Sequence, residues 1–132
     1  MKISLRATNN GLILDLHGQW PKSDGELSRV REDMDQALEG RAGPLIYYVH
    51  DAKFPKANHL GLLVGAAMRA KGVSHGFAIV SPSERFRERL REVLIISDSP
   101  YSPIRGVYGT EEEALRDIER YREWKEGLGN AV

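Results

Sequence analysis

Apolar residues occupy every second position in two short segments near the start of the chain, residues 2–8 and 12–18. A period of two is typical of a strand with one buried and one exposed face. The apolar positions are Ile3, Leu5, Ala7, Leu12, Leu14 and Leu16. Because the residues between the segments, Asn-Asn-Gly at 9–11, favour a tight turn, the pattern predicts a β-hairpin.

Three later segments carry a helix-start signal, a hydroxyl residue followed three positions later by a glutamate. The pairs are Ser23 with Glu26, Ser81 with Glu84, and Thr110 with Glu113. This spacing is typical of a capping box, in which the hydroxyl accepts a hydrogen bond from the backbone of the first turn. Apolar residues recur at helical spacing after each pair. We therefore predict helices with N-caps at Ser23, Ser81 and Thr110.

A fourth helix is predicted over residues 58–71, with Asn58 as its N-cap and Gly72 at its end. Short apolar runs rich in β-forming residues lie between the helices, at residues 44–50, 75–81 and 104–109. They predict strands, of which the first two are buried. A hairpin followed by alternating helices and strands predicts a single α/β sheet with short crossovers.

Composition narrows the function classes. The chain has 132 residues, enough for one domain, and no cysteine, which excludes disulfides and thiol chemistry. It has 19 basic and 19 acidic residues, so no overall field attracts nucleic acid. No segment approaches the length of a membrane span, and the first residues lack the apolar core of a signal peptide. We expect a cytoplasmic protein that neither binds nucleic acid nor inserts into a membrane.

Catalytic and metal-binding motifs are missing from the sequence. It contains no phosphate-binding glycine loop, no dinucleotide fingerprint, no zinc-protease motif and no nucleophile elbow. The four histidines are His17, His50, His59 and His75. They fall near predicted strand ends or a helix start, where ligands bind in α/β proteins, but no spacing between them matches a metal motif. We therefore expect no catalytic residue, no metal and no cofactor.

The segment from Tyr48 onward resembles a known family, the STAS domain of sulfate transporters and anti-sigma factor antagonists. The matching stretches are YYVHDAKFPKANHLGLLVGAAMRAKG, FAIVSPSERFRERLREVL and GVYGTEEEAL. Their order resembles the family's strand ending in aspartate, its Asp-Ser-Ser-Gly-Leu-Gly type motif at a helix start, and its later strands and helices. The positions that carry the resemblance are Asp51, Leu60, Gly61, Gly72, Pro82 and residues 112–115.

The resemblance implies a STAS-like domain over residues 1–120, followed at 121–132 by the end of the last helix and a frayed tail. It implies a mixed, mostly parallel sheet of about five strands with helices packed largely on one face. It also implies a binding module and not an enzyme. Bacterial members bind an anti-sigma factor-type kinase, and phosphorylation of the motif serine breaks that complex, because a phosphate adds about two negative charges at a helix start.

The sequence departs from the family at the motif itself. Aligning Leu60 and Gly61 with the family's Leu-Gly places Lys56 at the acid, Ala57 at the phosphorylated serine and His59 at the motif glycine. Ala57 has no hydroxyl, so phosphorylation cannot occur there. Lys56 and His59 instead introduce residues able to carry positive charge. The resemblance implies a binding surface made of Asp51, Phe54, Lys56, Ala57, Asn58, His59, Leu60 and Gly61.

Three classes of function follow from these observations. We favour a regulatory module that binds a protein partner without phosphoregulation at Ala57. The alternative is a STAS-like domain that binds a lipid or small ligand, or that serves as the soluble subunit of a lipid transporter. An enzyme with His59 or His50 as general base is the third. Phosphorylation at Ser97, Ser99 or Ser102 and homodimer formation are left open by the sequence.

Overall fold

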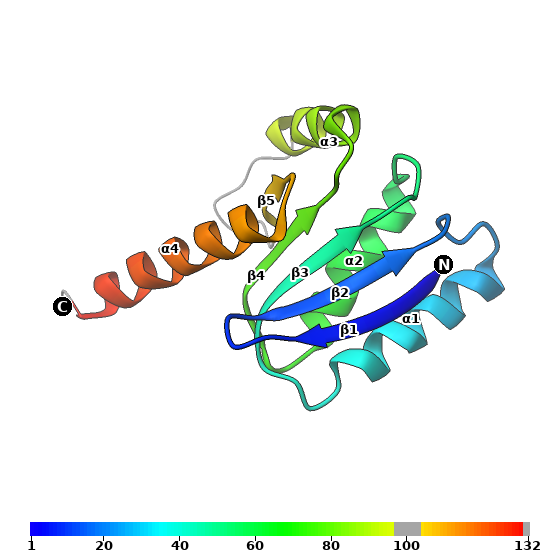
Figure 1. Ribbon diagram of the computed structural model, residues 1–132. Coiled ribbons are helices and arrows are strands. Elements are labelled where there is room, and N and C mark those ends of the chain that lie inside the picture. Colours follow the sequence, from blue (N-terminus) through cyan, green and yellow to red (C-terminus); the bar gives the residue numbers. More distant parts are fainter. Residues whose placement is uncertain (97–103, 131–132) are drawn as a thin grey trace.

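The computed structural model describes residues 1–96 and 104–130, which form one five-stranded sheet and four helices (Figure 1). The strands are β1 (Lys2–Ala7), β2 (Leu12–His17), β3 (Gly43–Val49), β4 (Val73–Val80) and β5 (Ile104–Tyr108). The helices are α1 (Asp24–Leu38), α2 (Ala57–Arg69), α3 (Glu84–Ile96) and α4 (Glu111–Asn130). The predicted hairpin and the alternation of helices and strands are confirmed.

The strands lie side by side in the order of the sequence, β1-β2-β3-β4-β5. β1 pairs antiparallel with β2, and the other neighbours pair parallel. Each parallel connection returns through a helix, as crossovers of this kind require. The loops that follow β2, β3 and β4 therefore meet at one edge of the sheet, the carboxyl edge, where α/β proteins commonly bind ligands.

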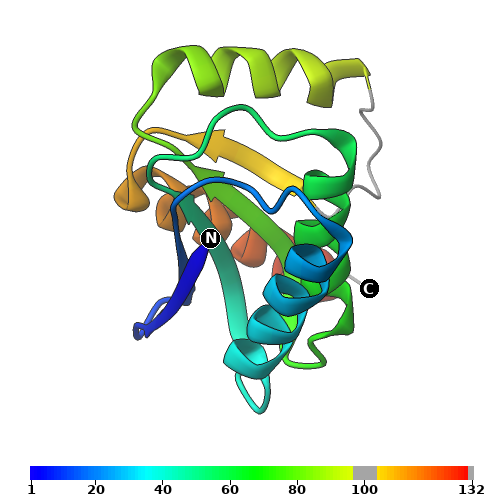
Figure 2. The same cartoon turned by 90° about the vertical axis from the view of Figure 1, so that its right-hand side faces the viewer.

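Helices cover both faces of the sheet, three on one face and one on the other (Figure 2). Residues of α1, α2 and α3 share the larger core with Leu14, Tyr47 and Phe77 of the sheet. On the opposite face Ala114 and Ile118 of α4 pack in a smaller cluster. This arrangement confirms the expected mixed sheet with helices largely on one face.

The predicted half-buried character of residues 12–18 is wrong for most of β2. Residues 12–16 are all buried, including Ile13 and Asp15 on the face away from α1 and α2. β2 lies inside the sheet, and Ile13 belongs to the cluster under α4, so both of its faces are covered. β1 is the edge strand and keeps the alternation of half-buried and exposed positions over its first residues.

Two of the three predicted N-caps are confirmed and one is displaced. The backbone N–H groups of Glu26 and Glu113 donate to the hydroxyls of Ser23 and Thr110 at 3.2 Å. The cap of α3 is Ser83, whose hydroxyl accepts from the Phe86 N–H at 3.2 Å. Ser81 lies two residues before that cap: its N–H donates to the Tyr108 carbonyl, and its hydroxyl accepts from the Ser83 N–H at 3.2 Å.

A buried hydroxyl ties α2 to the centre of the sheet. The Tyr47 side chain is fully buried, and its hydroxyl donates to the Leu63 carbonyl at 2.7 Å. Burial raises the pKa of Tyr47, so the phenol remains protonated as this bond requires. The bond anchors the helix that carries the predicted binding surface.

We expect Tyr47→Phe to lower the free energy of unfolding by about 1 kcal/mol, because it removes one buried hydrogen bond without opening a cavity. Urea denaturation followed by circular dichroism measures the change. Tyr48→Phe is the matched control, because the described residues provide no hydrogen bond to its hydroxyl and it is only half-buried. Equal losses in both variants would contradict the anchoring role of the Tyr47 hydroxyl.

Candidate functional site at the start of α2

The helix begins one residue earlier than predicted, and its N-cap lies two residues earlier. α2 begins at Ala57 with Lys56 as its N-cap, so Asn58 lies within the first turn and does not cap the helix. The cap comes from His59, whose Nδ1 accepts a hydrogen bond from the Lys56 N–H at 3.1 Å. An imidazole nitrogen here takes the place of the glutamate carboxylate of an ordinary capping box.

His59 is a buried structural residue and not a surface charge. It is 6% exposed, and its ring stacks on Trp20 with the ring centroids 5.3 Å apart. Its Nε2 lies 2.9 Å from the Pro21 carbonyl, which can only accept. The two hydrogen bonds together require a neutral ring with its proton on Nε2. The expectation that His59 adds positive charge to the surface is therefore wrong, and it is not placed to act as a general base.

The loop between β3 and α2 is fastened to the loop between β2 and α1. The Trp20 indole N–H donates to the Lys53 carbonyl at 2.6 Å, and the Gln19 amide bonds the backbone of both Asp51 and Lys53. The Asp51 carboxylate accepts from the Gly18 N–H at 2.7 Å. Asp51 is exposed, and it helps to hold the two loops together.

Phe54 connects the same loop to α3. Its ring is half-buried and lies 5.8 Å from the Phe86 ring, measured between centroids. The Arg89 guanidinium carbon lies 4.3 Å from the centre of the Phe54 ring, a cation–π contact. Phe86 and Arg89 of α3 therefore help to position this part of the predicted surface.

The exposed side chains at the helix start are Lys56, Ala57 and Asn58, with Gly61 exposed one turn later. Leu60 is half-buried and packs against the larger core. Of the eight residues predicted from the sequence, His59 is buried, while Phe54 and Leu60 divide their surface between core and solvent. Lys56, Ala57, Asn58 and Gly61 are exposed around the start of α2, and Asp51 is exposed in the loop before it.

A hollow of about 390 Å³ opens between the two fastened loops. We name it the lysine hollow because three lysines border it. Its lining comprises Gln19, Trp20, Pro21, Lys22, Lys53, Phe54, Lys56, Asn58 and His59. Sequence reasoning missed Trp20, Lys22 and Lys53. One signal in the sequence could have indicated Trp20. A large aromatic ring beside a proline in a short loop is buried only by contacts with other segments, so Trp20 was a candidate for packing against a distant loop.

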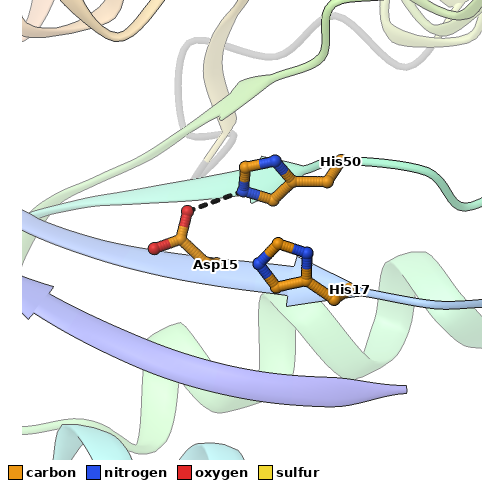
Figure 3. Close-up of side chains that lie close together, drawn as sticks. All are labelled: Asp15, His17 and His50. Atoms are coloured by element: carbon orange, nitrogen blue, oxygen red, sulfur yellow. Dashed lines mark hydrogen bonds and ion pairs between the residues drawn. The ribbon is translucent and has the colours of Figure 1, made fainter.

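The remaining histidines divide between two places. His50 and His17 stack on each other with ring centroids 4.1 Å apart, on the sheet face away from α1 and α2 (Figure 3). His50 Nε2 lies 2.7 Å from Asp15 Oδ1. His50 therefore bonds Asp15, whereas its chain neighbour Asp51 bonds the backbone of Gly18. The side chain of His75, and Ser97, Ser99 and Ser102, lie outside the described residues.

The Asp15 carboxylate lies beside these rings and accepts hydrogen bonds from two side chains. Burial alone would raise the pKa of Asp15, but hydrogen bonds from Arg6 and His50 outweigh it and lower the pKa below its usual value. Arg6 donates from Nε to Oδ2 at 2.5 Å and from Nη2 to Oδ1 at 2.9 Å. Asp15 is therefore ionised at neutral pH despite being buried.

Comparison with known proteins supports the fold. No protein-family model matches the sequence, and no curated protein matches it either. Among solved structures, the chain is similar to an anti-sigma factor antagonist from Mycobacterium paratuberculosis, with a TM-score of 0.59 and 14% identity. The likeness covers 89% of this chain and 93% of that one. In the described part of the chain, no helix has the length and apolar character needed to cross a membrane. The chain therefore has a STAS-like α/β fold.

Proposed function

We propose that this protein is a non-catalytic regulatory module that binds an acidic segment of a protein partner at the lysine hollow and the start of α2. The observation that carries the proposal is that Lys22, Lys53 and Lys56 line the same hollow as the aromatic residues Trp20 and Phe54. Aromatic side chains beside positive charge provide both apolar contact and charge complementarity, the two properties of a protein-recognition site.

The outer surface of α2 extends this site. Ala57 and Gly61 are exposed, Val64 is half-buried and Met68 is 74% exposed. These positions are three or four residues apart and therefore follow one face of the helix. Small side chains near the helix start allow a partner backbone to approach closely, and the exposed methionine adds adaptable apolar contact.

The absence of a hydroxyl at position 57 supports binding without a phosphate switch at that residue. Ala57 is the first residue of α2, where backbone N–H groups lack helical partners and the helix dipole is positive. No phosphate can form there to cancel that charge or that of Lys56. By resemblance to anti-sigma factor antagonists, an anti-sigma factor-type kinase is the partner class to test first.

The small-ligand alternative has less support. Pockets for small ligands are mostly enclosed and apolar, with a few polar groups that fix the orientation of the ligand. The lysine hollow is open to solvent and has three lysines in its lining. A larger hollow of about 720 Å³ lies at the opposite edge of the sheet and is also bordered by charged side chains, among them Asp35, Arg69 and Lys71.

The proposal predicts that Lys53→Glu combined with Lys56→Glu weakens partner binding at least about tenfold, because two attractive charges become repulsive. The test is affinity capture from a lysate of the organism that encodes the chain, followed by titration of the captured protein. The matched control combines Lys2→Glu with Lys71→Glu, which makes the same charge change at exposed positions outside the hollow.

A protein that binds the wild type and the control but not the Lys53/Lys56 variant supports the proposal. Its affinity should also fall as salt increases, because exposed charges are screened. Equal capture by both variants, or no captured protein at all, contradicts a docking site at the lysine hollow.

A further inference from the structure

A second cluster of chemically active side chains lies on the sheet face away from α1 and α2, apart from the lysine hollow. Asp15 and His17 project from β2, and His50 follows β3 (Figure 3). β2 and β3 are parallel neighbours with Leu16 opposite Val49, so the residue after each lies at the same height on the sheet. This register brings together two histidines that are far apart in the sequence.

The three side chains are close enough to share one ion. One potential ligand atom from each of Asp15, His17 and His50 lies within 4.8 Å of the other two. Among the described residues, this is the one group of three or more histidine or acidic side chains that meets this condition. Four-coordinate zinc, with ligands about 2.0–2.2 Å from the metal, needs ligand atoms closer together than this, so the side chains must reorient when the ion binds.

Exposure to solvent is unequal within the cluster. The Asp15 side chain is 7% exposed and the His50 side chain 30% exposed, while His17 faces solvent. The stacked rings are nearly parallel, at 10°, so their nitrogen lone pairs do not yet converge on one point. Within the described residues no hydrogen bond holds the His17 ring, and zinc binding would replace its stacking contact with His50.

The surroundings of the cluster favour a cation. Arg6 bonds two carboxylates, those of Asp15 and Glu111, so with neutral histidines this group carries one net negative charge. Arg6 bonds both oxygens of Asp15, from Nε to Oδ2 and from Nη2 to Oδ1, and His50 also approaches Oδ1. A metal at Oδ1 would displace the contacts with Arg6 Nη2 and His50, and it would leave the bond from Arg6 Nε to Oδ2 as outer-shell support for the carboxylate. Support of this kind orients metal ligands in proteins.

We propose that Asp15, His17 and His50 bind one zinc ion, with the fourth coordination position open to solvent. Two imidazoles and one carboxylate are a donor set that zinc accepts. Sequence reasoning expected no metal because ligand spacing was judged along the chain. The structure assigns the ligands through the register of two strands, which sequence spacing does not show.

Zinc titration of the chain, freed of metal and of any histidine tag, tests the proposal by calorimetry. We expect one zinc ion to bind per wild-type chain. His17→Ala and His50→Ala should each weaken binding at least about tenfold, because each removes one of three ligands. Asp33→Asn, at an exposed carboxylate on α1 outside the cluster, is the control and should bind zinc as the wild type does.

Two further measurements separate a lost ligand from a damaged fold. Zinc should raise the melting temperature of the wild type and leave that of His17→Ala unchanged, since binding to the native state alone stabilises it. His17 is exposed, so its variant should melt like the wild type without metal. Cobalt in place of zinc should give the intense visible bands of a tetrahedral site. Zinc binding that is unchanged in His17→Ala, or absent from the wild type, overturns the proposal.

Discussion

Replacing His59 with alanine is expected to lower the free energy of unfolding by about 3 kcal/mol. The change leaves the Lys56 N–H and the Pro21 carbonyl without their hydrogen-bond partner. It also opens a void beside Trp20, against which the buried ring stacks. Chemical denaturation followed by tryptophan fluorescence measures the loss and also detects the altered surroundings of Trp20.

Asn58→Ala is the matched control for this prediction. Asn58 is the neighbouring residue of the same helix turn, it is exposed, and it does not cap the helix. We expect a change within about 0.5 kcal/mol, as for ordinary surface substitutions. His59→Gln should recover part of the stability, since an amide both accepts and donates. If His59→Ala is as stable as Asn58→Ala, the histidine does not fasten the two loops.

This structural role changes how the binding surface should be probed. A negative charge at position 59 would lie buried beside the Pro21 carbonyl, and the fold would be weakened together with any partner contact. Charge changes at Lys53 and Lys56 avoid this problem because both side chains are exposed. The lysines therefore report on binding, whereas His59 reports on the scaffold beneath it.

Replacing Gly72 with alanine is expected to cost roughly 3 kcal/mol of stability, because a side chain there has no space. A Cβ on Gly72 would lie 1.9 Å from the Arg41 carbonyl oxygen and 2.9 Å from the Ala42 Cα. Both are backbone atoms, so the two chain segments must separate. Separation also strains the hydrogen bond from the Gly43 N–H to the Gly72 carbonyl, 3.0 Å long. Thermal and urea denaturation measure the effect.

Gly61→Ala is the control of the same chemistry at a glycine with free space. Gly61 lies inside α2, and a Cβ there would meet no atom within 4 Å. Alanine is the better helix former, so we expect a gain of up to about 1 kcal/mol. A loss at Gly61, or no loss at Gly72, would contradict the packing described for these positions. Because Gly61 is exposed at the proposed docking surface, its variant should also be tested for weaker partner binding.

The sequence by itself determined the order of helices and strands and two of the helix caps. Local patterns were sufficient there because a capping hydroxyl and its N–H partner lie three residues apart, as at Ser23 and Thr110. The caps at Asn58 and Ser81 were mispredicted because contacts with distant residues help to set where α2 and α3 begin. His59 caps α2 while its other nitrogen bonds Pro21, and the Ser81 N–H donates to the Tyr108 carbonyl.

Only the tertiary structure decided which side chains of the predicted surface are available to a partner. Sequence patterns place residues 51–61 together, but the burial of His59 and the role of Asp51 depend on a loop more than thirty residues earlier in the chain. The lysine hollow arises where these two loops meet, and the pair of His17 and His50 where two parallel strands align. Contacts between distant segments are set by packing and strand register, which local patterns do not encode.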